Sequence, residues 1–522
     1  MSKKLYKRTP IDKLNTLLFG KDLRITEGDR YTDEREFDYT SYYPVEDYIS
    51  PQKLPSDKVY YITDFGAVAN DDSIDNAPCV NKCICECAKN GGGYVVVSGG
   101  DFTAKTVELK SGVTLFIESK SSLVAEKSGE GFSNKAFIYA ENCHDICITG
   151  GGVINGNGHI FGRKPLLDKN ITEADEVIDV IKMRRDYRAQ LRFAHPSKYG
   201  RLVHFCDCRN ISVHNIIFYD SAYWTFRMTR CSDIEIKNFV INDNRHVCNT
   251  DGIDLMQCSN VEINHCFISC ADDGIVLKNA IWEGCNGEMS DIHISDCEII
   301  SCTNAFKIGT ETTYPIKNIV VENCRFLMTD LYPGSVSGIS IESADGSTVE
   351  NVTVKNIEMK RCTCPVFIRL CNRNRAALVN EQSVTAVEYG VKPEGKGVDK
   401  NTFDMTGEIN NIIIENIKAD DIELPVIIAG FRQKGVTKKV SNITLSTFRL
   451  KYRDAVEVYD KRLFIPEYSK EYPECWRFRN LPAYAIWARH AENICIEDFE
   501  CIPAKNTWRE KYAFIDVENI RR

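Results

Sequence analysis

Beyond about residue 140, apolar and polar residues alternate in short runs, and each run begins at an Asn or Asp. Such alternation is typical of half-buried β-strands whose Ile and Val side chains point to one face. The runs recur at steps of 23, 27, 31, 27 and 33 residues and then at longer steps, so the chain contains a structural repeat. Their first residues are Asn210, Asp233, Asn260, Asp291, Asn318, Asn351, Asn411, Asn442 and Asn493.

Each repeat has room for two or three short strands separated by turns. One unit cannot bury its apolar face alone, so the units are expected to stack into one continuous core. Helical repeats of similar length are excluded by the β-branched alternation and the many turn residues. Asn tolerates left-handed turns, and Cys packs as a small residue, so both suit the corners. The sequence therefore predicts an all-β solenoid.

The solenoid is expected to span residues 56–522, with residues 1–55 as an N-terminal arm that is rich in tyrosine and charge. An amphipathic stretch from Asp75 to Asn90 ends at three glycines and predicts a short helical cap. Two segments near 163–198 and 372–408 break the repeat and are predicted insertions. Long loops on a rigid scaffold are commonly functional, although plain decoration is the alternative.

Composition is ordinary for a soluble globular protein, with 43% hydrophobic and 27% charged residues. No apolar run approaches the roughly 20 residues of a membrane span, so we expect no membrane partner. The net charge of −9 argues against a nucleic-acid partner, and an anionic substrate would need a local basic patch. The N-terminus is basic, but its apolar run Leu17–Phe19 is too short for a secretory signal, so we expect a cytoplasmic protein.

The chain contains 23 cysteines, an unusually high number. Without an export signal, we interpret them as reduced, small apolar residues. The cluster of Cys79, Cys83, Cys85 and Cys87 suggests a metal site, but a zinc site usually takes paired ligands from two segments. The helical interpretation is favoured, and no metal is predicted.

Two acidic signatures, Asn249–Asp254 and Ala271–Ile275, contain the candidate catalytic residues Asp251, Asp272 and Asp273. Aligning the inward Ile and Leu residues of the two segments places Asp251 over Asp273, and Asp272 over Thr250. The three acids thus divide into a stacked pair and a separate one. This division suits inverting hydrolysis of a glycosidic bond, in which one carboxyl protonates the leaving oxygen and carboxylates activate water.

The chain resembles glycoside hydrolase family 28, the polygalacturonases and rhamnogalacturonan hydrolases, over most of residues 59–520. The resemblance rests on Asp64–Ala67, Ile148–Gly156, Asn249–Gly252, and Asp272-Asp273 followed by Lys278. It implies a right-handed parallel β-helix without metal or organic cofactor. It also implies that Asp272 is the general acid and that Asp251 and Asp273 position the nucleophilic water. Asn249 and Lys278 lie in the matching motifs and are candidate substrate contacts, with a solvated surface lysine as the alternative for Lys278.

The chain departs from the family pattern at two places. Thr303 stands where the family has a histidine, and Ser340-Ile341-Glu342 stands where polygalacturonases have Arg-Ile-Lys to hold a uronate carboxylate. The second change reverses the local charge, so simple polygalacturonan is not the expected substrate.

Extending the alignment places Val276, Lys307 and Ser340 in one outward column and Lys278, Glu342 and Arg369 in the next. Lys307, Glu342 and Arg369 are therefore candidate substrate contacts, with surface or structural roles as the alternative. Trp224 is a candidate sugar-stacking platform, although an aromatic residue at a corner is more often packing. His246, beside Arg245, is a candidate cleft residue or an ordinary turn residue.

The combined prediction is an inverting glycoside hydrolase that acts on galacturonate- or rhamnogalacturonan-type oligosaccharides derived from pectin. Exo-action is expected because a cytoplasmic enzyme meets imported fragments, and the two insertions would wall off one end of the groove. One alternative is a polysaccharide lyase, which would need calcium ligands and a basic residue. The other is a non-catalytic carbohydrate-binding solenoid. Assembly into a homo-oligomer is compatible with the sequence.

Overall fold

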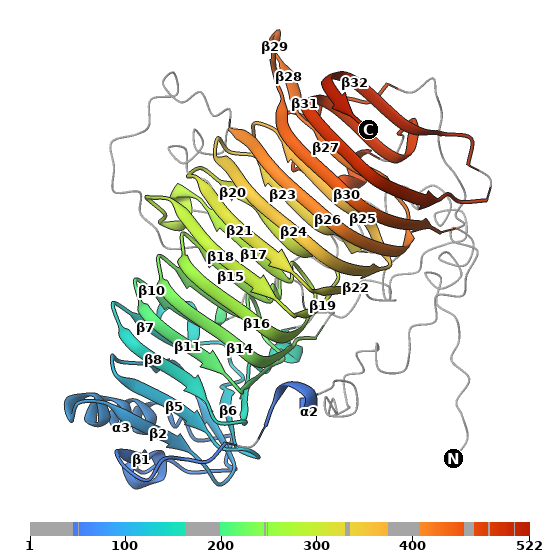
Figure 1. Ribbon diagram of the computed structural model, residues 1–522. Coiled ribbons are helices and arrows are strands. Elements are labelled where there is room, and N and C mark those ends of the chain that lie inside the picture. Colours follow the sequence, from blue (N-terminus) through green and yellow to red (C-terminus); the bar gives the residue numbers. More distant parts are fainter. Residues whose placement is uncertain are drawn as a thin grey trace, which may run out of the picture.

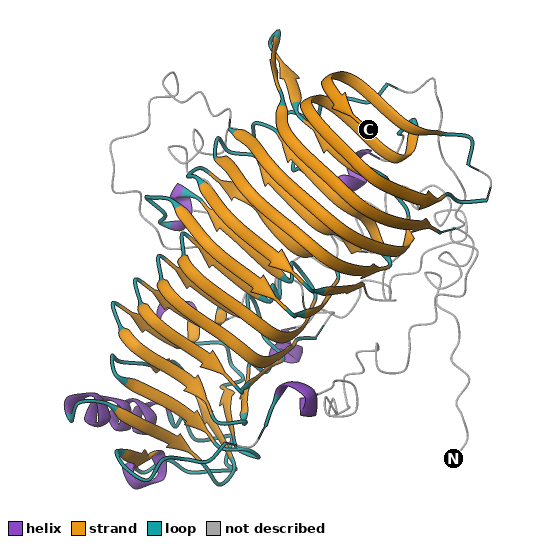
Figure 2. Ribbon diagram, viewed as in Figure 1, coloured by secondary structure: helices purple, strands orange, loops and turns teal. Residues whose placement is uncertain are grey.

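The computed structural model describes residues 45–50, 52–161, 199–244, 247, 249–328, 335–373, 407–453, 464–478, 481–505 and 507–522. Thirty strands form one sheet that coils along the length of the molecule, and every pairing between these strands is parallel (Figure 1). Helices are few and short, as Figure 2 shows. The alternating pattern of the sequence therefore corresponds to a parallel β-helix, in which successive turns of chain lie directly over one another.

The strands form three stacks that run the length of the coil. The stack that later proves to carry the acids contains β4 (Val107–Glu108), β7 (Ala136–Glu141), β10 (Arg201–Cys206), β13 (Phe226–Thr229), β15 (Ile253–Met256), β17 (Ile275–Asn279), β20 (Asn304–Thr312), β23 (Ser335–Ser343), β25 (Cys362–Leu370) and β27 (Val426–Ala429). We call it the acid stack.

The second stack contains β1 (Val59–Tyr61), β2 (Gly93–Val97), β5 (Val113–Ile117), β8 (His144–Thr149), β11 (Arg209–His214), β18 (Met289–Ser295) and β21 (Ile316–Glu322). The third contains β3 (Asp101–Ala104), β6 (Ser122–Ala125), β9 (Val153–Asn155), β12 (Ile217–Tyr219), β19 (Glu298–Ser301) and β22 (Arg325–Met328).

Long strands bend from one stack into another: β14 (Ser232–Asn242), β16 (Ser259–Cys270), β24 (Thr348–Lys360), β26 (Glu408–Ile422), β30 (Val440–Tyr452), β31 (Ala483–Ile502) and β32 (Glu510–Arg521). A separate antiparallel hairpin joins β28 (Phe431–Gln433) to β29 (Val436–Lys438). Short helices are α2 (Val45–Tyr48), η3 (Ile62–Phe65), η4 (Ser133–Lys135), η5 (Gly158–Phe161), η7 (Ile281–Glu283) and η9 (Cys475–Phe478).

The Asn anchors of the repeat stack on one another at a corner. Asn318, Asn351 and Asn411 have φ of 58°, 57° and 55°, in the left-handed region that Asn tolerates. The side-chain amide of Asn351 donates to that of Asn318 at 3.1 Å, and Asn411 donates to Asn351 at 2.8 Å. The amide ladder fixes the register between turns, which keeps each inward Ile or Val over its counterpart in the next turn.

The predicted helical cap is present as α3 (Ala77–Lys89), which lies at the N-terminal end of the coil (Figure 1). It buries Val80, Cys83, Ile84 and Cys87, spaced three and four residues apart as one helical face requires. Two of the cysteines considered as metal ligands are therefore core residues. The cysteines of the described residues all carry free thiols, and most are buried.

The described end of the arm packs against the outside of the coil. Val45, Tyr48 and Ile49 contact a small apolar cluster on the third stack, and the Tyr48 ring stacks on His265 with ring centroids 4.7 Å apart. The predicted insertion at 163–198 and most of that at 372–408 lie outside the described residues.

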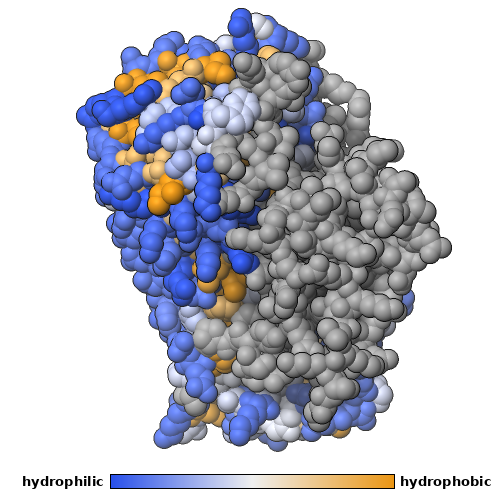
Figure 3. Space-filling model, turned by 90° about the vertical axis from the view of Figure 1, so that its right-hand side faces the viewer, coloured by the Kyte–Doolittle hydropathy of each residue, from blue (hydrophilic) through white to orange (hydrophobic). Residues whose placement is uncertain are grey.

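The surface of the described part is mainly hydrophilic in the view of Figure 3, with hydrophobic side chains gathered toward one end. This agrees with a core that lies inside the coil. Within the ranges given above, no helix combines the length and apolar character that crossing a bilayer requires.

Candidate active site

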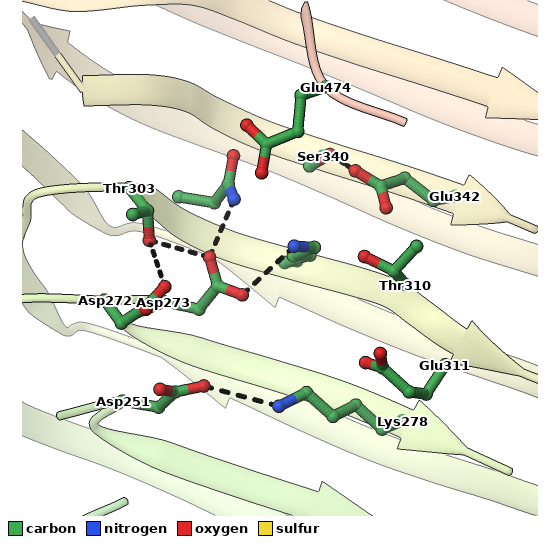
Figure 4. Close-up of polar contacts among 12 residues, drawn as sticks. Asp251, Asp272, Asp273, Lys278, Thr303, Thr310, Glu311, Ser340, Glu342 and Glu474 are labelled. Atoms are coloured by element: carbon green, nitrogen blue, oxygen red, sulfur yellow. Dashed lines mark hydrogen bonds and ion pairs between the residues drawn. The ribbon is translucent and has the colours of Figure 1, made fainter. Parts of the chain in front are cut away.

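The three predicted acids lie together at the start of two neighbouring strands of the acid stack (Figure 4). Ile253 pairs with Ile275 and Leu255 with Leu277, which is the predicted alignment. One carboxylate oxygen each from Asp251, Asp272 and Asp273 can be chosen so that all lie within 4.8 Å of one another. This distance matches what one water spans when it makes a hydrogen bond of about 2.8 Å to each of two oxygens.

Two glycines allow the turns to approach this closely. A Cβ on Gly252 would lie 2.5 Å from the carbonyl oxygen of Gly274, and a Cβ on Gly274 would lie 2.6 Å from that of Ala305. Both distances are shorter than any normal contact, so the Asp-Gly-Ile segment recurs because only glycine fits after the acid.

Asp273 is buried and is surrounded by donors. Its Oδ1 accepts hydrogen bonds from Thr303 Oγ1 at 2.8 Å and Asn304 Nδ2 at 2.7 Å, and its Oδ2 lies 3.1 Å from Lys307 Nζ. Burial alone would raise the pKa of this carboxyl, but Lys307, Lys278 and the two hydrogen bonds together lower it. Asp273 is therefore held in its ionised form.

Asp251 has fewer partners. It shares the ammonium group of Lys278 with Asp254: Nζ lies 3.3 Å from Asp251 Oδ2 and 2.6 Å from Asp254 Oδ1. Burial, and then the Asp254 charge, raise the pKa of Asp251 well above its usual value, although Lys278 opposes this. Burial likewise raises the pKa of Asp254 to about 6. One lysine cannot neutralise two buried carboxylates, so this pair retains a proton.

Asp272 is the most exposed of the three acids, being only partly buried. Its Oδ1 lies 3.1 Å from Thr303 Oγ1 and accepts the backbone N–H of Asp273 at 3.1 Å. Its carbonyl oxygen accepts the hydroxyl of Ser301 at 2.6 Å. The backbone is thus fixed, while the residue stays partly exposed to solvent. Thr303, which replaces the family histidine, reaches two of the three acids.

Lys307 lies in the predicted column, paired with Val276 on one side and Ser340 on the other. The column that was to join Lys278 to Glu342 is interrupted, because β20 carries extra residues between Ile308 and Thr312. Glu342 is buried and accepts a hydrogen bond from Ser340 at 2.7 Å. Burial raises the pKa of Glu342 to about 8, against the effect of Lys307, so the group is largely neutral at neutral pH.

Arg369 does not reach the acids, which corrects the prediction that it lies near them. Its guanidinium is buried and donates to the carbonyl oxygens of Gly430, Glu467 and Tyr468 at 2.5, 2.6 and 3.0 Å. These hydrogen bonds occupy the donors that a substrate would need. Arg369 was placed in the correct column, opposite Glu342, but sequence could not show that a later segment covers it.

That segment is residues 464–478, which we call the covering segment. Arg489 donates to the carbonyl oxygens of Ile465 and Pro466 at 2.8 and 2.7 Å, next to the residues that Arg369 holds. Farther along, the Tyr472 hydroxyl lies 3.4 Å from Lys307 Nζ, and Glu474 reaches over the strands near Ser340 (Figure 4). Nothing in the sequence pattern links this segment to the acids, so both residues escaped prediction.

Trp224 is buried, with 7% of its surface exposed, so it is not an open stacking platform. Lys278 Nζ lies 4.2 Å from the ring centroid, and the guanidinium carbon of Arg227 lies 5.1 Å from it. The indole thus packs against the lysine that serves Asp251, and the packing alternative holds.

The two other predicted contacts precede the first acid. Asn249 is partly exposed in the turn before Asp251, with φ of 59°. His246 lies outside the described residues. Asp254 belongs to the Asn249–Asp254 signature, but no role was predicted for it. Its outward position on β15 could have indicated that it lies beside Lys278.

The description "Glycosyl hydrolases family 28" belongs to a family model that matches residues 87–389 of this chain. A probable polygalacturonase of Arabidopsis thaliana is 25% identical over 324 residues, which cover 59% of this chain and 61% of that protein. An endo-polygalacturonase of Pectobacterium carotovorum is 26% identical over 317 residues, covering 57% and 72%.

Among solved structures, an exopolygalacturonase of Thermotoga maritima matches with a TM-score of 0.55 and 20% identity, over 78% of this chain and 90% of that one. This likeness confirms the predicted right-handed parallel β-helix.

Proposed function

The chain belongs to the glycosyl hydrolases of family 28, and we propose that it is an inverting, exo-acting hydrolase of pectin-derived oligosaccharides. The observation that carries the proposal is the group of three acids, in which Asp273 is held ionised and Asp272 is the most exposed. A neutral acid beside an ionised base is what hydrolysis of a glycosidic bond requires.

In the proposed reaction, Asp272 gives its proton to the leaving oxygen. Asp273 and Asp251 hold one water between them, and Asp273, whose pKa is lowered, accepts a proton from it as it attacks the anomeric carbon. Many inverting enzymes space their carboxyls about 6.5–9.5 Å apart. The acids here are closer together, so the proposal of inversion does not rest on that spacing. It rests on the family resemblance and on a water that fits between oxygens no more than 4.8 Å apart.

The charges beside the acids favour a neutral sugar over a uronate at the position that Glu342 and Lys307 approach. Both nearby lysines are already engaged, Lys278 with Asp251 and Asp254 and Lys307 with Asp273. Glu342 adds a carboxyl where a uronate-binding site would carry a cation. We therefore propose a rhamnogalacturonan-type fragment in preference to plain polygalacturonan.

Exo-action is supported by the covering segment. It is fixed to the coil by two buried arginines and reaches the lysine that serves Asp273. A chain that lies along the acid stack would meet this segment directly beyond the acids, so the groove would accept only a chain end. This assigns to residues 464–478 the blocking role that was predicted for the insertions.

The test is incubation with a panel of galacturonate and rhamnogalacturonan oligosaccharides, with products followed by proton NMR. We expect one terminal sugar to be released with inverted anomeric configuration, and the Asp272→Asn variant to be inactive. An unsaturated uronate product would support the lyase alternative. Binding without turnover, unchanged in Asp272→Asn, would support the non-catalytic one. A cytoplasmic location and self-association stay predictions.

A further inference from the structure

Thr303 stands between the proposed acid and the proposed base. Its Oγ1 lies 2.8 Å from Asp273 Oδ1 and 3.1 Å from Asp272 Oδ1, and Figure 4 shows the hydroxyl directed at both carboxyls. The residue is 6% exposed, so little water reaches the hydroxyl. Because a hydroxyl has one hydrogen but two lone pairs, it can donate to one of these carboxyls while it accepts from the other.

The proposed reaction exchanges the charges of these two acids. Before it, Asp272 is neutral and Asp273 is ionised; after it, Asp272 has lost a proton to the leaving oxygen and Asp273 has gained one from water. A second turnover requires Asp273 to lose its proton and Asp272 to gain one. Asp273 is buried beneath Thr303, Asn304 and Lys307, so direct exchange of its proton with bulk water is hindered.

We propose that Thr303 returns the proton between these acids after each turnover, an inference that rests on the proposed function. The proton on Asp273 Oδ1 passes to Thr303 Oγ1 as the hydroxyl hydrogen of Thr303 passes to Asp272 Oδ1. One O–H bond breaks and one forms at the threonine, so its charge does not change. Asp273 is ionised again and Asp272 is neutral again, which restores the starting state.

The surroundings of Thr303 hold its hydroxyl in this position. Its N–H donates to Ser301 Oγ at 2.9 Å, and its carbonyl oxygen accepts the N–H of Val336 at 2.8 Å. Ser301 in turn donates to the Asp272 carbonyl oxygen at 2.6 Å. The backbones of the relay residue and of the acid are thus tied to one serine, which keeps the oxygen-to-oxygen distance short. Asn304 and Lys307 do not displace Thr303 from Asp273. Asn304 donates to the same oxygen, Oδ1, beside the threonine hydroxyl, and Lys307 binds Oδ2.

The test compares Thr303→Val, which keeps the shape but removes the hydroxyl, with Thr303→Ser, which restores it. We expect kcat of Thr303→Val to fall about 100-fold, at the low end of what one proton-transfer group contributes, and Thr303→Ser to stay within a few-fold of the parent enzyme. Acetate buffer should partly restore kcat of Thr303→Val, because acetic acid can protonate the partly exposed Asp272 while acetate accepts the proton that Asp273 must lose. The parent enzyme should not respond to buffer concentration.

Thr310→Val is the matched control, since this buried threonine on β20, the strand that begins directly after Thr303, has a hydroxyl without a hydrogen-bond partner in the described part of the chain. Its kcat should equal that of the parent enzyme. A Thr303→Val variant with full activity at low buffer concentration would overturn the relay. So would a loss of activity that buffer does not relieve and serine does not repair.

A second measurement needs no turnover. Carbon-13 NMR of the aspartate carboxyls should show that the midpoint of Asp273 titration rises in Thr303→Val, because a hydrogen bond that favours the anion is lost, and returns in Thr303→Ser. If the parent protein hydrolyses nothing but its titration responds in this way, the proposed function fails while the link between the acids stands. An active protein whose titration and kcat both ignore the hydroxyl would refute the relay alone.

Discussion

Lys307 Nζ lies 3.1 Å from Asp273 Oδ2, with the two side chains 2% and 7% exposed. A buried lysine is stable only with such a partner, and Asp273 in turn needs the lysine to stay ionised. The pair therefore links the stability of the coil to the charge state of the proposed base.

Removal of this lysine should affect stability and activity together. We expect Lys307→Met to lower the free energy of unfolding at neutral pH by about 3–5 kcal/mol, because Asp273 loses its buried counter-ion. The pKa of Asp273 is lowered in the fold, so its contribution is present above the unfolded value and is lost as the pH falls through the folded one. Urea unfolding at several pH values should show the gap between variant and parent narrowing in acid.

The same substitution should raise the pKa of Asp273 and shift the acidic limb of kcat/KM toward higher pH. Lys317→Met, which removes a surface lysine paired with Glu288 and Glu350, is the control and should change neither property much. Equal losses in the two variants would contradict the special role of the buried pair.

The pH dependence of stability that we expect from Glu342 has the opposite sign. Burial raises its pKa to about 8, so the folded protein binds a proton there that the unfolded chain releases near its ordinary value. Its stabilising contribution is thus present below the unfolded pKa and is lost as the pH rises through about 8. Glu342→Gln cannot ionise, so its stability should fall less between pH 5 and 8 than that of the parent protein. Thermal unfolding at both pH values measures this, with the exposed Glu415→Gln as control.

The sequence predicted the coil because alternation and the Asn anchors are local signals that every turn repeats. The stacking of Asp251 over Asp273 followed from the same alignment, since Ile253 and Ile275 are inward residues of adjacent turns. Roles that depend on a distant segment could not be predicted. Arg369 contacts Tyr468, and Lys307 contacts Tyr472, only because the chain returns over the acid stack after β30, and no repeat pattern encodes that return.

Substitution of Arg369 should lower the stability of the fold and loosen the covering segment. Arg369→Met removes hydrogen bonds to the carbonyl oxygens of Gly430, Glu467 and Tyr468, so we expect a loss of about 3 kcal/mol in the free energy of unfolding. The covering segment should become sensitive to proteases, and internal bonds of longer oligosaccharides should begin to be cut. Mass spectrometry of the protein fragments and of the sugar products reads out both effects.

Arg449→Met, which removes an exposed arginine paired with Asp498, is the matched control and should leave cleavage at chain ends intact. If Arg369→Met instead weakened substrate binding without loosening the covering segment, the original interpretation of Arg369 as a substrate contact would be restored.

Removal of divalent cations should leave activity unchanged. The three acids are spaced so that they could surround a cation, and a calcium-dependent lyase would use them in that way. However, Asp251 and Asp273 already have ammonium groups at 3.3 and 3.1 Å, and a doubly charged ion would have to displace or repel both lysines. Activity measured after dialysis against EDTA, with and without added calcium, tests this point. Loss of activity that calcium restores, together with an unsaturated uronate product, would overturn hydrolysis, whereas Asp273→Asn should abolish turnover with or without the chelator.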